Sequence, residues 1–150
     1  MKKIYLSLMS LLTISSCYYH DSDPTVVQNV ILYNKSVPTI KSYLAGKWKL
    51  NYKIGGLSGN QRTDYFSTFY DFEFLAVDTF SRIDSGKVTI NSPISWLKFP
   101  VFANDSIYVI EYKLPNGVEL AFYPKEIKSG VLDLVEPCPD CYSYFLMRAN

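Results

Sequence analysis

The chain has 150 residues, 48% of them hydrophobic, and a formal net charge of +1. This length suits one domain with a short extension, and the apolar content is enough to build a core. A nearly neutral chain without a basic cluster excludes nucleic-acid binding and an electrostatic membrane patch as expected functions. The 13 tyrosines and 9 phenylalanines favour strands over helices.

Residues 1–16 are typical of a secretory signal peptide, with Lys2 and Lys3 followed by an apolar stretch and small residues. The eleven residues 4–14 would span only about half of the roughly 30 Å hydrocarbon core, too little for a transmembrane helix. The segment Ile14-Ser15-Ser16-Cys17 resembles a bacterial lipobox. The resemblance implies that Cys17 carries lipid and becomes the mature N-terminus. The alternative is a signal peptide that merely contains a cysteine near its end.

A lipid anchor at Cys17 would hold residues 17–38 as a tether between the membrane and the domain. Several acyl chains, each buried CH₂ contributing about 0.8 kcal/mol, give stable attachment. Tyr18 follows the cysteine, whereas an Asp there retains better-known lipoproteins at the inner membrane. The resemblance therefore implies the outer membrane, on either its periplasmic or its cell-surface face. Residues 26–33 are apolar enough to pack on the domain or to add an edge strand.

The domain itself is expected to span residues 39–150, beginning with one or two helical turns at Thr39–Ala45 that Gly46 ends. In Lys47–Ile54 apolar and polar residues alternate, which predicts a strand with one buried face. The glycine-rich loop 55–60 is no phosphate cradle, because no helical pattern follows it. The apolar face of the strand would carry Trp48, Leu50, Tyr52 and Ile54.

Eight further strands complete the predicted domain. Asp84-Ser85-Gly86 and the Asn-Gly at 116–117 are typical turn sequences between strands. Eight or nine strands joined by short turns predict an all-β fold, either a sandwich or an antiparallel up-and-down barrel, whose closure removes exposed edges. The predicted strands are Phe69–Leu75, Val77–Ile83, Lys87–Ile90, Ile94–Phe102, Ser106–Lys113, Val118–Tyr123, Val131–Glu136 and Tyr142–Arg148.

Two short motifs at the ends of this strand series, Gly46-Lys47-Trp48 and Arg148, resemble the lipocalin (calycin) barrels, in particular the lipocalin-like domains of small bacterial lipoproteins. The resemblance implies a barrel of about eight strands whose floor is closed by Trp48, with Arg148 packed over the indole ring. Such a pair gains about 1–2 kcal/mol when partly desolvated. A core tryptophan and an unrelated surface arginine are the alternative.

Cys138 and Cys141 lie in a turn between two predicted strands. In an exported protein an even pair at this spacing indicates a disulfide that staples the turn. Redox activity is the minority alternative, since it needs a thiol activated by a helix N-terminus and no helix is predicted there. Asp140 alone does not complete a metal site, so neither a metal nor another cofactor is expected.

The single histidine, His20, lies in the tether, which excludes histidine-based catalysis and metal binding in the domain. Asp71 and Glu73, two apart on a strand, are typical of its hydrated face, so we expect no enzyme. The aromatic residues of segment 65–74 either line an apolar pocket or pack the core.

The sequence leaves two functions open. The first is binding of a small apolar or amphipathic ligand in the barrel mouth, which requires a pocket of at least a few hundred Å³. The second is a protein-interaction module with a filled barrel and an exposed apolar patch, whose partner the sequence does not identify.

Overall fold

The computed structural model describes residues 29–57, 59, 61–100, 106–138 and 140–149. The predicted signal peptide, Cys17, His20 and most of the tether lie outside these residues. The described part contains one helix, α1 (Val37–Leu44), and ten strands. The strands are β1 (Val30–Ile31), β2 (Gly46–Gly55), β3 (Gln61–Asp64), β4 (Thr68–Phe74), β5 (Asp78–Asp84), β6 (Lys87–Pro100), β7 (Ser106–Lys113), β8 (Glu119–Lys128), β9 (Val131–Val135) and β10 (Tyr142–Arg148).

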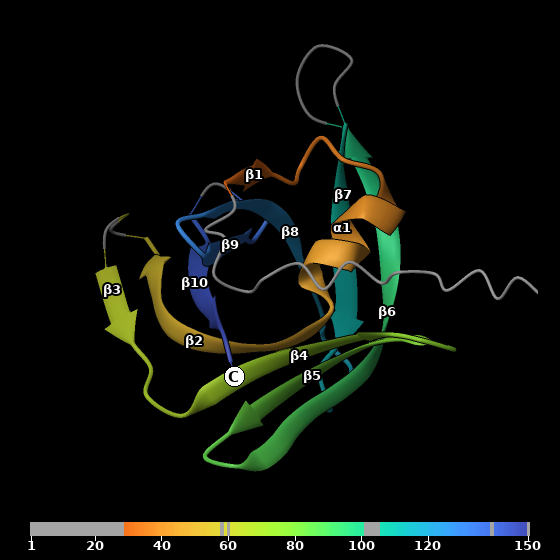
Figure 1. The fold of residues 1–150 in the computed structure, drawn as a ribbon. Coiled ribbons are helices and arrows are strands. Elements are labelled where there is room, and N and C mark those ends of the chain that lie inside the picture. Colours follow the sequence, from red (N-terminus) through yellow and green to blue (C-terminus); the bar gives the residue numbers. More distant parts are fainter. Residues whose placement is uncertain (1–28, 58, 60, 101–105, 139, 150) are drawn as a thin grey trace, which may run out of the picture.

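Eight of the strands close into an antiparallel up-and-down barrel (Figure 1), which confirms the predicted fold class. Going around the ring, β2 pairs with β4, and β4 to β10 then pair in sequence order. Pairing of β10 with β2 closes the ring. The two remaining strands lie beside it, β3 on β2 and β1 on β8. Closure leaves the eight ring strands without free edges along most of their length.

The folded domain begins earlier than residue 39. Val30 pairs with Ile127 of β8, and Leu32 is fully buried in the core. The predicted tether 17–38 was therefore wrong for residues 30–38, which belong to the folded domain. The sequence indicated this through the apolar run 26–33, which was expected either to pack on the domain or to add an edge strand.

Helix α1 closes one end of the barrel, and Figure 1 shows it inside the ring of strands. Ile40 and Leu44, four residues apart, share one helix face and are fully buried in the core. Pro38 lies in the first turn, where its missing N–H costs no helical hydrogen bond. The helix starts two residues before the predicted position and ends just before Gly46.

Two predicted strands, Lys87–Ile90 and Ile94–Phe102, are in fact the single strand β6. Its first half pairs with β5 up to Pro93, and its second half pairs with β7 from Ile94 onward. The expected gap between them contains Pro93, and proline has no N–H to donate to a ladder and usually disrupts a strand interior. Here the proline lies where the strand exchanges partners, so it interrupts neither ladder.

Other differences also follow from pairing. Strand β8 continues past Tyr123 through Pro124, and a register shift between Pro124 and Glu126 accommodates the proline. Strand β3 was not predicted, because its four residues are polar and exposed and carry no apolar signal. The hairpin with β2 determines its conformation.

The alternation predicted for β2 holds only in its first half. Trp48 and Leu50 are buried, but the register with β10 shifts between Phe145 and Leu146, opposite the segment from Leu50 to Tyr52. Tyr52 consequently leaves the buried row and stacks on Phe145, with ring centroids 4.7 Å apart. The prediction of four apolar residues on one face was therefore wrong beyond Leu50.

The barrel interior is packed by aromatic side chains. Phe72, Phe80 and Phe122 meet with ring centroids 5.3–6.2 Å apart, and Tyr70 and Tyr112 pack against the same group. Leu32, Ile40 and Leu44 fill the space on the α1 side as part of the same cluster. The segment 65–74 therefore divides: Tyr70 and Phe72 are core residues, whereas Phe66 is 86% exposed.

Candidate functional site

The structure brings Trp48 and Arg148 together at the α1 end of the barrel. The two residues are register partners on β2 and β10, and the guanidinium carbon of Arg148 lies 4.2 Å from the centroid of the Trp48 ring. Trp48 is 1% exposed, and its Nε1 donates a hydrogen bond of 2.8 Å to the carbonyl of Leu44. Arg148 Nη2 donates to the carbonyl of Tyr43 at 2.8 Å, and Nη1 donates to that of Ala45. These bonds tie the end of α1 to both strands.

Gly46 fits the same arrangement for two reasons. Its φ of +97° lies in the region that favours glycine, and a Cβ at this position would stand 3.1 Å from Nη1 of Arg148. The guanidinium therefore occupies the space that a side chain would need. Partial burial lowers the pKa of Arg148 from its ordinary value. Gly46, Trp48 and Arg148 therefore form one packed group at the α1 end of the barrel, as the expected floor would require.

The disulfide expected between Cys138 and Cys141 is present, in the turn that joins β9 to β10. The carboxylate of Glu136 and the two sulfurs lie within 4.8 Å of one another. Both Glu136 oxygens are engaged, Oε1 by the Tyr144 hydroxyl at 2.5 Å and Oε2 by the Tyr142 N–H at 3.1 Å. With the sulfurs joined and the carboxylate occupied, the group serves to fix the turn.

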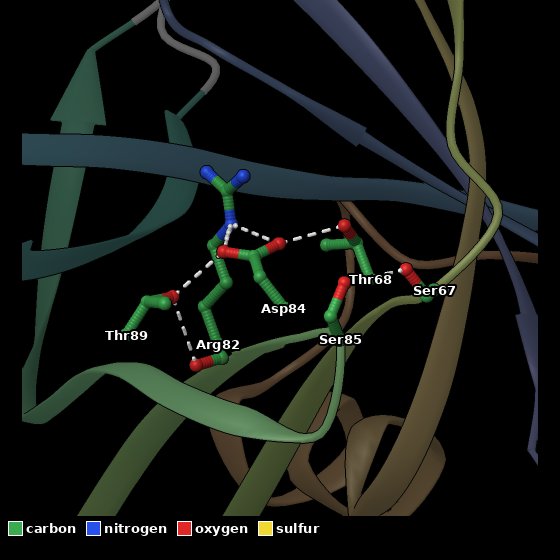
Figure 2. Close-up of polar contacts among 6 residues, drawn as sticks. All are labelled: Ser67, Thr68, Arg82, Asp84, Ser85 and Thr89. Carbon is green, nitrogen blue, oxygen red and sulfur yellow. Dashed lines mark hydrogen bonds and ion pairs between the residues drawn. The ribbon is translucent and has the colours of Figure 1, made fainter.

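At the other end of β5 from α1, polar side chains of β4, β5 and β6 form a cluster (Figure 2). Asp84 accepts hydrogen bonds of 2.7 Å from the hydroxyls of Thr68 and Thr89, and Arg82 Nε lies 3.0 Å from its Oδ2. Burial acts to raise the pKa of Asp84, but the two hydroxyls and Arg82 outweigh it and lower the pKa. The carboxylate is therefore ionised at neutral pH. This cluster was not predicted from the sequence, although Arg82 and Asp84 follow the core residue Phe80 at a spacing of two and so share its strand face.

A pocket of about 670 Å³ lies against β7, β8 and β9. Two of its lining residues, Tyr123 and Val135, are cross-strand partners, and each directly follows a core residue, Phe122 or Leu134. Because strand side chains alternate, the pocket lies on the outer face of the barrel. Its apolar lining residues include Tyr33, Phe99, Ile107, Tyr123 and Val135, and its polar ones include Lys125 and Glu136.

A charged pair stands beside the outer pocket. Lys125 Nζ lies 3.2 Å from Oδ2 of Asp133, which is only 6% exposed. Oδ1 of the same carboxylate is buried and has no hydrogen-bond partner among the described residues. Burial raises the pKa of Asp133, and Lys125 opposes this effect only in part. The signal missed in the sequence was the series of apolar residues at outward positions of β7, β8 and β9.

The other candidates remain apart. Asp71 and Glu73 lie two residues apart along β4, Asp71 half-buried and Glu73 exposed, and neither forms an ion pair with a described residue.

Within the described ranges no helix is long and apolar enough to cross a membrane. No protein-family model matches the chain, and comparisons with curated proteins and with solved structures found no match.

Proposed function

We propose that the protein is a lipid-anchored, non-catalytic binding protein of the bacterial outer membrane, and that it holds a small amphipathic molecule in the outer pocket. The observation that carries this proposal is the pocket itself. Its volume of about 670 Å³ lies within the range of roughly 300–1,000 Å³ typical of small-molecule sites. We assign the ligand to the outer face, and not to the barrel mouth expected from the sequence, because aromatic side chains fill the interior.

The lining of the pocket supports an amphipathic ligand. Phe99, Ile107 and Tyr123 offer apolar surface to the body of the molecule. Lys125 offers a cation whose side chain is 45% exposed, so it can meet a polar head group while still paired with Asp133. Apolar walls with a few polar groups that fix orientation are the usual composition of such sites.

The anchor rests on the lipobox resemblance at Cys17. Twelve residues separate Cys17 from Val30, the start of β1, and an extended chain of this length reaches about 40 Å. A tether of this length would keep the barrel close to the bilayer. Replacement of Cys17 by Ser is expected to release the protein from the membrane fraction. Retention there would contradict the anchor.

Native mass spectrometry of the full chain, purified from its own bacterial envelope, tests the ligand. The full chain is needed because a fragment starting at Leu44 would lack Leu32 and Ile40, which are core residues. We expect a retained small-molecule mass in the wild type that Phe99→Ser loses. Leu97→Ser is the matched control, since Leu97 lies on the same strand and is 43% exposed against 47% for Phe99, but does not line the pocket.

The filled interior also favours the second function, a protein-interaction module that uses the barrel as a scaffold. The same experiment separates the two. Protein binding would replace ligand binding if the wild type carries no small molecule. In that case the wild type should instead retain a partner protein, and Phe99→Ser should lose it.

A further inference from the structure

We propose that the polar cluster around Arg82 binds the carboxylate of a small organic acid. We call this cluster the Arg82 site and define it by Thr68, Tyr70, Arg82, Asp84, Thr89 and Tyr112. It is separate from the outer pocket, with which it shares no residue. The proposal is therefore independent of the function proposed above.

The orientation of Arg82 leaves its terminal nitrogens available to a ligand. Its Nε faces Asp84, 3.2 Å from Oδ1 and 3.0 Å from Oδ2. Figure 2 shows the two terminal nitrogens pointing away from Asp84. Among the described residues they have no hydrogen-bond or ion-pair partner. A planar guanidinium that presents both terminal N–H groups in this way matches the two oxygens of a carboxylate.

The cluster also holds Arg82 in place. The hydroxyls of Thr68 and Thr89 each donate to Asp84 at 2.7 Å, from the two strands on either side of β5. Asp84 is thereby fixed from both neighbours, and it fixes Arg82 in turn. A preorganised donor costs less entropy when a ligand binds. The side chain of Arg82 is 33% exposed, so a ligand can reach it from solvent.

Two tyrosine hydroxyls add donors. Tyr70 is the register partner of Arg82, and Tyr112 packs on Phe80 with ring centroids 4.7 Å apart. Burial raises the pKa of Tyr70 and raises that of Tyr112 to about 12, so both hydroxyls keep their protons at neutral pH. Neither hydroxyl forms a hydrogen bond with a described residue. Both can therefore donate to an oxyanion.

Charge and surroundings select the type of anion. Asp84 offsets the positive charge of Arg82, and the Glu136 carboxylate also acts on Tyr112 from the turn between β9 and β10, so the site favours a monoanion over a dianionic phosphate. The buried rings of Tyr70, Phe80 and Tyr112 pack together and place apolar surface next to the cluster. A carboxylate attached to a small apolar or aromatic group fits both conditions.

A matched control exists in the chain. Arg62 and Asp64 form an Arg-x-Asp pair with the same spacing, on β3, with side chains 54% and 50% exposed. Both Nε and Nη2 of Arg62 bond to Oδ1 of Asp64, so one of its two terminal nitrogens is already engaged, unlike those of Arg82. A diffuse attraction between anions and arginines would act at both pairs. A built site would act only at Arg82.

The test is a titration of the full chain with sodium benzoate, followed by backbone amide resonances in NMR spectra at constant ionic strength. We expect saturable shifts at Thr68, Tyr70, Arg82 and Thr89. Affinity should fall about tenfold or more with Arg82→Gln and also with Arg82→Lys, which keeps the charge but not the fork. Arg62→Gln should bind as the wild type does, and inorganic phosphate should bind more weakly than benzoate.

Several results would overturn the proposal. These are an absence of saturable shifts in the wild type, shifts confined to the outer pocket, or unchanged affinity in Arg82→Lys. Tighter binding of phosphate than of benzoate would reject the carboxylate. If Arg82→Gln does not fold, the wild-type shift map and Arg82→Lys still decide the outcome. Phe99→Ser, which should lose the outer-pocket ligand, should still bind benzoate at the Arg82 site.

Discussion

The contact between Trp48 and Arg148 should stabilise the barrel floor by a measurable coupling energy. We would replace Trp48 by Leu and Arg148 by Met, alone and together, and compare the four proteins. Each single change also removes other interactions: Trp48→Leu leaves the Leu44 carbonyl without its donor, and Arg148→Met releases the carbonyls of Tyr43 and Ala45. These losses occur in both backgrounds, so they cancel in the double-mutant cycle and leave the term between ring and guanidinium.

The expected coupling is about 1 kcal/mol. A guanidinium over an aromatic ring contributes about 0.5–1 kcal/mol when exposed and about 2 kcal/mol when desolvated. The Trp48 ring is 1% exposed, but Arg148 is exposed to water, which screens part of the attraction. Trp48→Leu alone should cost more, about 2–4 kcal/mol, because it leaves a cavity at a fully packed site.

Urea unfolding followed by far-ultraviolet circular dichroism gives the four free energies of unfolding, and it is independent of the lost tryptophan fluorescence. Lys47 over Phe69, 4.9 Å from the ring centroid, is the control pair, with Lys47→Met and Phe69→Leu. Since Lys47 is exposed, its coupling should be about 0.5 kcal/mol or less. Additivity of Trp48→Leu and Arg148→Met within about 0.3 kcal/mol would refute the idea that the two residues act as a unit.

Three further outcomes follow from the structure. Cys138→Ser should lower the free energy of unfolding by about 2 kcal/mol, because the disulfide closes a loop of four residues; a reducing agent should lower the wild type equally and leave the variant unchanged. Gly55→Ala should destabilise the protein far more than Gly59→Ala in thermal melts, because its Cβ would stand 2.1 Å from the Cys141 carbonyl oxygen, whereas that of Gly59 meets nothing within 4 Å. The pKa of Asp84 is lowered below 3.8, so the stability that its carboxylate contributes is present above the unfolded pKa and is lost as pH falls through the folded pKa. The difference in free energy of unfolding between wild type and Asp84→Asn should therefore shrink below about pH 4. A difference that stays constant with pH would contradict the hydrogen-bonded role of Asp84.

Local sequence signals were sufficient where pairing followed them. Strands β7 and β10 have the predicted bounds because alternation and turn residues act over a few positions. The split predicted within β6 was wrong because a proline breaks a strand only where the ladder needs an N–H, and at Pro93 the strand changes partner, so none is needed. Strand β3 gave no signal at all, since its pairing with β2 alone makes it a strand.

The sequence by itself determined the strand-rich, barrel-forming pattern, the spacing of the cysteine pair, and the presence of Gly46, Trp48 and Arg148 at the two ends of the domain. Tertiary structure decided which side chains face the barrel interior and which face its outer surface. Register shifts move residues such as Tyr52 from one face to another, and a one-residue shift reverses every side chain that follows. For this reason the filled interior, the pocket on the outer face and the unpaired nitrogens of Arg82 emerge only when the eight strands have closed around the core.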